Sequence, residues 1–264
     1  MKISILFSYQ VVLIILLIIN SSYGSIVILN GLTHIHQTNH GSAITGKIKL
    51  RNDSNTPEKV LVYKEELILA CGVEGDFSNA TTHPRSLSPY IITNLNEKEL
   101  LPNEEYDVNY TISLPANLSN GSYWTVLMIE GADPVVTNDN SGLKINSKVR
   151  YAVQIIADHG SYENGNLNFE NVKVKNLASE KKMVDVLLKN EGNFSTKTKV
   201  ILEIYNEKKQ KLKVLESYFK RIYPQKCNSF EIEVSGLAKG KYEGILIADN
   251  GTDLLASNVE IEIE

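Results

Sequence analysis

Three histidines close together, His34, His36 and His40 in the sequence HIHQTNH, are the side chains whose spacing most resembles a metal-binding site. On a β-strand, residues i and i+2 share a face, and His40 keeps the parity of the other two. Three imidazoles on one face can bind zinc or copper. The alternative is three solvated histidines on an edge strand and its turn, because neither a cysteine nor a carboxylate lies near them. We expect the solvated arrangement, and therefore no metal and no cofactor.

Side chains that could carry out hydrolysis follow no familiar pattern. The sequence lacks both Gly-x-Ser-x-Gly and His-Glu-x-x-His. Adjacent acids such as Glu65 and Glu66 point to opposite faces of a strand, so they cannot act together on one substrate. The segments Asn138–Gly142 and Asp249–Asp253 are interpreted as hairpin turns, because neither has the spaced ligands and the distal Glu of a calcium loop. We therefore expect a protein that is not an enzyme.

The first 25 residues have the three parts of a secretory signal peptide. Lys2 gives a positive start, Val11–Ile19 is apolar, and Ser22-Tyr23-Gly24 offers a small-x-small cleavage site. An uncleaved anchor is the alternative, but the nine residues of Val11–Ile19 are fewer than the ~20 that a membrane span needs. We expect a mature chain in the periplasm or outside the cell, with no stable membrane insertion.

Charge and cysteine content narrow the choice of partners and of cross-links. The net charge is −4 and becomes one unit more negative when Lys2 leaves with the signal peptide. Because charges of both signs are scattered, a nucleic-acid partner is not indicated. Cys71 and Cys227 lie far apart and in different predicted domains. We expect two buried or partly buried thiols, with a disulfide as the alternative in an oxidising compartment.

Short alternating strands between turn residues predict an all-β protein, since no segment has a convincing helical period. Seven strands are predicted in each half, which is the number in an immunoglobulin-like sandwich. In the first half they lie at Ile26–Leu29, Ala43–Arg51, Lys59–Leu69, Ser88–Thr93, Tyr106–Leu114, Ser122–Glu130 and Ile145–Ala157. In the second half they lie at Phe169–Lys175, Met183–Asn190, Lys199–Tyr205, Leu212–Tyr218, Ser229–Val234, Lys241–Ala248 and Ala256–Ile263.

An internal repeat supports two tandem sandwich domains. Leu118, Gly121, Tyr123 and Leu127 recur with the same spacing as Leu237, Gly240, Tyr242 and Leu246. The Gly-x-Tyr pair resembles the corner tyrosine of such sandwiches, whose hydroxyl bonds to the preceding loop. A second echo relates LRNDSN at Leu50–Asn55 to LKNEGN at Leu188–Asn193.

The repeat sets the predicted domain boundaries. The signal peptide covers residues 1–25, the first domain 26–158, a polar linker 159–168, and the second domain 169–264. Between the two echoes the first domain is longer than the second, and we place its extra residues in the loop Gly72–Pro89. A loop of that length is either functional or mobile.

The segment Gly142–Ala157 (GLKINSKVRYAVQIIA) predicts an unusually long strand. Apolar residues occupy alternate positions from Leu143 to Ile155, and a strand of that length would extend ~50 Å. Gly121–Gly131 (GSYWTVLMIEG) is its predicted hairpin partner across the turn Ala132–Ser141. A strand that outreaches its own sheet has a free part that can pair with another protein. Two arginines have simpler explanations, since Arg150 can be a solvated strand residue and Arg85 a loop residue that caps or forms a salt bridge.

The order of elements resembles that of the periplasmic pilus chaperones and their relatives in exported proteins. The strand Gly121–Gly131 is followed by a long turn, by an extended strand that carries the basic residue Arg150, and by a second sandwich. The resemblance implies that Leu143 and Ile145, with Val149 further along, contact a client that lacks one strand. It also implies that Arg150 binds the client's C-terminal carboxylate in the cleft between the domains. The family has a second basic residue near the start of its first strand, whereas Ile26–Leu32 (IVILNGL) contains none.

The resulting expectation is an exported, chaperone-like protein that binds a protein client, such as a pilin-like or other surface-structure subunit, by strand addition. The first alternative is a structural tandem module of a surface or extracellular assembly. The second is a metal or ligand carrier that uses His34, His36 and His40.

Overall fold

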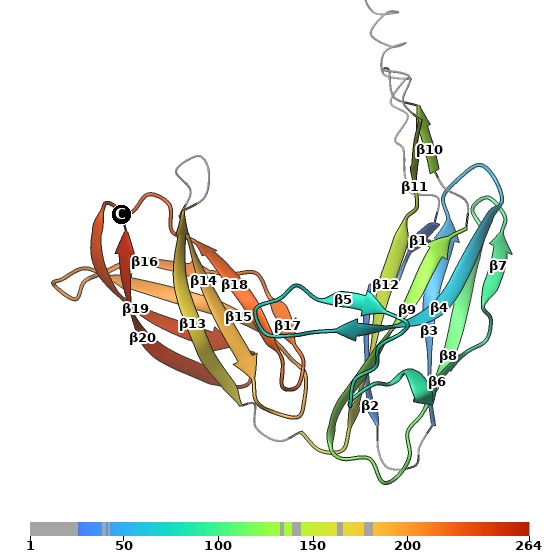
Figure 1. Ribbon diagram of the computed structural model, residues 1–264, viewed down its shortest axis with the longest axis horizontal. Coiled ribbons are helices and arrows are strands. Elements are labelled where there is room, and N and C mark those ends of the chain that lie inside the picture. The colour runs from blue at the N-terminus through green and yellow to red at the C-terminus, as the bar shows by residue number, and fades with distance from the viewer. Residues whose placement is uncertain are drawn as a thin grey trace, which may run out of the picture.

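In a computed structural model of the chain, the described residues are 26–38, 41, 43–132, 135–138, 144–162, 166–176 and 182–263. They form two β-sandwiches in tandem, joined by the chain between β12 and β13 and by a hairpin that reaches across (Figure 1). The predicted all-β class and the two tandem immunoglobulin-like sandwiches are confirmed. The signal peptide lies outside the described residues.

The first sandwich packs two sheets around one core. Their strand orders are β1-β3-β8-β6 and β2-β12-β9-β4-β5, with β7 also paired to β4, and β10 and β11 form a separate two-stranded ribbon. The elements are β1 (Ile26–Ile28), β2 (Thr33–Thr38), β3 (Ala43–Asn52), β4 (Glu58–Ile68), β5 (Asp76–Ser78), the 3-10 turn η1 (Ser88–Tyr90), β6 (Ile91–Thr93), β7 (Glu97–Leu100), β8 (Glu105–Ser113), β9 (Gly121–Gly131), β10 (Val135–Asn138), β11 (Lys144–Ser147) and β12 (Arg150–His159).

The second sandwich packs the sheet β13-β14-β18 on the sheet β16-β15-β19-β20, with β17 paired to β15. Its strands are β13 (Leu167–Asn176), β14 (Lys182–Asn190), β15 (Thr196–Tyr205), β16 (Lys211–Glu216), β17 (Lys220–Ile222), β18 (Cys227–Glu233), β19 (Gly240–Asp249) and β20 (Leu254–Ile263). The segment Asp249–Asp253 forms the turn between β19 and β20, as predicted.

The repeat predicted from the sequence extends to its hydrogen bonds. The hydroxyl of Tyr123 donates to the Ser119 carbonyl at 3.0 Å, and that of Tyr242 donates to the Ala238 carbonyl at 2.9 Å. Both are corner tyrosines, which confirms the interpretation of the Gly-x-Tyr pairs.

The second echo marks a buried asparagine in each sandwich. The Asn52 amide donates to the carbonyls of Thr56 and Leu100, at 2.8 and 3.0 Å. The Asn190 amide donates to those of Phe194 and Ile222, at 2.7 and 3.1 Å. Each side chain therefore binds the turn that follows its strand to a distant segment.

The central strand β9 is buried on both faces, which explains the unbroken apolar run of its sequence. Tyr123 and Leu127 belong to the core between the sheets, whereas Trp124 and Met128 belong to a second cluster on the outer face. A strand that is buried on both faces needs no polar alternation.

The extra loop Gly72–Pro89 is largely a structured connection between the sandwiches. After Glu65, strand β4 leaves its sheet and pairs with β5. The tip of this hairpin carries Cys71, which forms a disulfide with Cys227 at the start of β18. Two free thiols were the favoured expectation, and that expectation is wrong. The two cysteines meet because the β4–β5 hairpin crosses to the second sandwich (Figure 1). We call residues 69–87 the strap.

Candidate strand-binding edge and interdomain joint

The strand β12 is only partly covered on one of its edges. On one side it pairs antiparallel with β9 from Arg150 to His159. On the other it pairs in parallel with β2, but only from Gln154 onward. Within the described chain, no strand pairs with this side of β12 ahead of Gln154. We call the stretch 150–153 the open edge.

The main chain of the open edge presents hydrogen-bonding groups outward. The N–H of Gln154 donates to the Leu32 carbonyl at 2.9 Å, on the β2 side. Since the N–H and C=O groups of alternate residues point to the same side of a strand, those of Ala152 and Arg150 also face this side. A segment placed beside them would continue the sheet upstream of β2.

The edge is open because the first strand changes sheets. Strand β1 pairs with β3 in one sheet, and β2 pairs with β12 in the other. The crossing contains Gly31, whose φ of 85° favours glycine. Asn30 holds the crossing against β3, because its amide donates to the Lys47 carbonyl at 2.8 Å and its oxygen accepts from Lys49 N–H at 2.9 Å.

The prediction of one continuous strand over Gly142–Ala157 is wrong, because the segment is interrupted. The structure divides it into β11 and β12, with Lys148 and Val149 between them outside any strand. The predicted turn Ala132–Ser141 also contains a strand, β10, which pairs antiparallel with β11. This β10–β11 ribbon extends beyond the rest of the first sandwich (Figure 1).

The four predicted client-binding residues therefore lie in different settings. Leu143 is outside the described residues, and Ile145 pairs with Thr137 in the ribbon. Val149 precedes the open edge and is 40% exposed. Leu32, whose carbonyl binds the other end of the edge, is 46% exposed. Apolar side chains thus lie at both ends of the open edge.

Arg150 lies among acidic groups of its own sheet. Its Nη1 is 3.7 Å from Glu65 Oε1 and 3.5 Å from the Tyr63 hydroxyl. The Tyr63 hydroxyl donates to Glu130 at 2.6 Å, and Lys148 Nζ is 3.2 Å from the other Glu130 oxygen. The Tyr63 hydrogen bond, more than the lysine, keeps the pKa of Glu130 below its usual range. The Arg150 side chain remains 44% exposed, so part of the guanidinium faces solvent beside the open edge.

The joint between the sandwiches has a polar end near the start of β9. Ser122 N–H donates to the Asn193 carbonyl at 2.8 Å, and Ser195 N–H donates to Ser122 Oγ at 2.6 Å. The same hydroxyl donates to Asp158 at 2.5 Å, and burial raises the pKa of Asp158. Arg85 was expected to cap or form a salt bridge, and its guanidinium instead donates to Asn193 Oδ1 at 2.9 Å.

The joint also has an aromatic part beneath the strap. Tyr223 of the second sandwich packs on Trp124, with ring centroids 4.6 Å apart, and its hydroxyl donates to Gln154 at 2.6 Å. His83 of the strap also stacks on Trp124, with ring centroids 4.3 Å apart. His83 Nε2 is 3.3 Å from the buried carboxylate of Glu66. The returning strap therefore covers the start of β9.

His34 and His36 lie on edge strand β2 and point toward the sandwich interior. Their ring nitrogens are 3.0 and 2.8 Å from the Tyr110 hydroxyl. Burial, and to a lesser degree His34, lowers the pKa of His36. The two side chains are thus half-buried rather than fully solvated. His40 is outside the described residues, and the described part holds no group of three or more potential metal-binding side chains.

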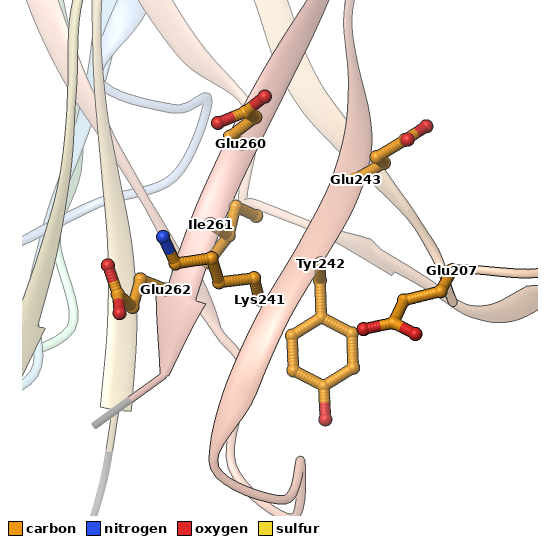
Figure 2. A pocket seen from close by; sticks show the side chains of 7 residues that line it. All are labelled: Glu207, Lys241, Tyr242, Glu243, Glu260, Ile261 and Glu262. Atoms are coloured by element: carbon orange, nitrogen blue, oxygen red, sulfur yellow. The ribbon is translucent and has the colours of Figure 1, made fainter.

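The second sandwich has a hollow of 360 Å³ around its corner tyrosine (Figure 2). Its lining is mainly acidic: Glu207, Lys241, Tyr242, Glu243, Glu260, Ile261 and Glu262. The Tyr242 hydroxyl is already bonded to Ala238. Among the described residues, no helix is long and apolar enough to cross a membrane.

Comparisons with known proteins gave matches among solved structures alone. No family model matches the chain, and no curated protein does. The class 5 fimbriae chaperone CfaA is 14% identical over 88% of this chain and 98% of that chain, with a TM-score of 0.46. The Pseudomonas aeruginosa chaperone CupB2 is 10% identical over 88% and 98%, with a TM-score of 0.45. A structure of the Salmonella enterica pilin SafA with the chaperone SafB matches at 11% identity over 92% and 98%, with a TM-score of 0.46. This chain is thus similar to solved structures of fimbrial chaperones over 88–92% of its own length and 98% of theirs.

Proposed function

We propose that this chain is an exported, non-enzymatic protein that binds a protein client by strand addition, in the manner of a chaperone, during assembly or secretion of a surface structure. The client is a pilin-like or other surface-structure subunit that lacks one strand. The observation that carries the proposal is the open edge, where the main-chain groups of Arg150 and Ala152 face outward ahead of the β2 pairing. An extended client segment would complete the ladder there.

The side chains around the edge supply the proposed specificity. Leu143, Ile145 and Val149 are the apolar residues that contact the client. Arg150 uses the exposed part of its guanidinium to bind a client carboxylate, while Glu65 holds its other side. The proposed place of action is the periplasm or the cell exterior.

Photo-crosslinking in the exporting cell tests the proposal. A photoreactive amino acid at Val149 should capture a surface-structure subunit, identified by mass spectrometry. The same group at Leu254, which is 72% exposed on the second sandwich, is the matched control and should capture no such subunit. Equal capture of one protein at both positions would contradict the proposal. Capture of a second copy of this chain at Val149 would instead indicate a structural module.

A double variant, Leu143→Asp with Ile145→Asp, tests the apolar contacts. Burial of two such side chains contributes about 3–6 kcal/mol, so the variant should lose the captured client. Its melting temperature should equal that of the Leu254→Asp control. A lower melting temperature in the isolated double variant would show that the two residues belong to the protein's own core.

A further inference from the structure

The two sandwiches are joined covalently at two places. One is the chain between β12 and β13, and the other is the disulfide between Cys71 on the strap and Cys227 on β18. The two cysteines are 156 residues apart in sequence. With one connection the sandwiches could pivot about it, whereas a second connection at a different point opposes that motion.

The noncovalent part of the joint is small on the side of the second sandwich. In the apolar cluster at the joint, Tyr223 is the sole described member from the second sandwich, and every other described member comes from the first. Further contacts between the sandwiches are the hydrogen bonds around Ser122 and Asn193 and the one from the Tyr223 hydroxyl to Gln154. Interfaces of this kind within a chain allow relative domain motion unless something further holds them.

The disulfide is accessible, and both cores lie elsewhere. Cys71 is exposed and Cys227 is half-buried, and neither belongs to a hydrophobic core cluster. A hollow of 500 Å³ lies beside the bond, between the strap tip and the sheet β13-β14-β18, with Gly72, Asn171 and Asn228 among its lining residues. A small dithiol can therefore reach the sulfur atoms without unfolding either sandwich.

We propose that the Cys71–Cys227 bond is a redox-operated lock on the orientation of the two sandwiches. A dithiol attacks the sulfur of Cys71, and the Cys227 sulfur leaves as a thiolate that takes up a proton. The second thiol of the reductant then displaces Cys71 from the mixed disulfide. The dithiol gives up two electrons and two protons in all, so both cysteines end as thiols and the reductant ends as an intramolecular disulfide. Oxidised protein has a fixed joint, and reduced protein has two folded sandwiches that reorient.

Reduction with dithiothreitol is a specific test, because the chain has two cysteines in total and they form this one bond. Residual dipolar couplings report the orientation of each sandwich in solution. In the oxidised protein, both sandwiches should fit one common alignment tensor. After reduction each should require its own tensor, and calorimetry should show two separate unfolding transitions. A common tensor and a single transition after reduction would overturn the proposal.

Two variants separate the bond from the noncovalent joint. Cys71→Ser should behave like the reduced wild type without any reductant, with unchanged circular dichroism. Oxidised Tyr223→Ala should keep the common tensor, because the bond persists, and should lose it on reduction. If oxidised Tyr223→Ala already has separate tensors, the aromatic contact is the lock and the proposal is wrong.

Discussion

Replacing Asn190 by alanine tests how the second sandwich holds the loop that forms the joint. Asn190 is 1% exposed. Its amide serves the carbonyls of Phe194 and Ile222, and its oxygen accepts from Gly192 N–H at 2.9 Å. The variant Asn190→Ala removes these partners from three main-chain groups. Each buried polar group left without a partner costs about 1–3 kcal/mol, so three of them cost about 3–9 kcal/mol. Because Gly192 is half-exposed, we expect the lower half of that range, about 3–6 kcal/mol.

Calorimetry can measure this loss in the full chain after reduction with dithiothreitol, when each sandwich should unfold in its own transition. A change of 1 kcal/mol shifts the melting temperature of a domain this size by roughly 4–8 °C, so the transition of the second sandwich should fall by at least about 12 °C. Asn52→Ala should lower the first sandwich similarly. Asn258→Ala, at an exposed position on β20, is the control and should change stability by less than about 0.5 kcal/mol. A shift below about 4 °C for Asn190→Ala would refute the reasoning.

Three further predictions concern other parts of the chain. The folded-state pKa of His36 is below the ordinary value of 6.5, so on acidification the unfolded chain binds a proton before the folded protein does. The free energy of unfolding should therefore fall as the pH decreases through 6.5. Between pH 7.5 and 5, the melting temperature of His36→Gln should fall less than that of the wild type. Arg150→Ala should lower the free energy of unfolding by less than about 1 kcal/mol, because the pair with Glu65 is partly exposed. The same variant should weaken the proposed client binding by ~2–5 kcal/mol, and Arg150→Lys should be intermediate. A large loss of stability with unchanged client binding would make Arg150 a structural residue. Tyr242→Phe removes the corner hydrogen bond and should lower the free energy of unfolding of the second sandwich by about 1 kcal/mol. An unchanged melting temperature of that sandwich would show that the hydrogen bond does not stabilise it.

The positions of most strands could be predicted from the sequence. Apolar runs such as Gly121–Gly131 give strands whose bounds agree with β9, because local patterning decides which segments are extended. The repeat also identified both corner tyrosines, since each bonds a carbonyl four residues before it. The second echo did not reveal that Asn52 and Asn190 are buried, because each also bonds a segment distant in sequence. Strand β2 was expected only as an edge strand carrying the histidines and was not among the seven strands predicted for the first half, because THIHQT is a polar segment with little apolar alternation.

The surroundings of the site depend on pairing between distant strands, which the sequence alone does not determine. Glu65 and Glu130 come beside Arg150 through the registers of β4, β9 and β12. A register change of one residue would place these side chains on the other face. The disulfide escaped prediction for the same reason, although the length of Gly72–Pro89 had already indicated an additional feature there. Only the route of the strap brings Cys71 to Cys227.

The cross-domain disulfide has a consequence for how copies of this chain can associate. Two copies exchange domains when each releases one unit and accepts the same unit of its neighbour, which requires the joint within each chain to open. Here the second sandwich is bonded through Cys227 to the strap of its own chain. Once that bond has formed, a swapped dimer is inaccessible without thiol exchange, whatever the protein concentration. Oxidation thus commits each chain to pairing its own two halves.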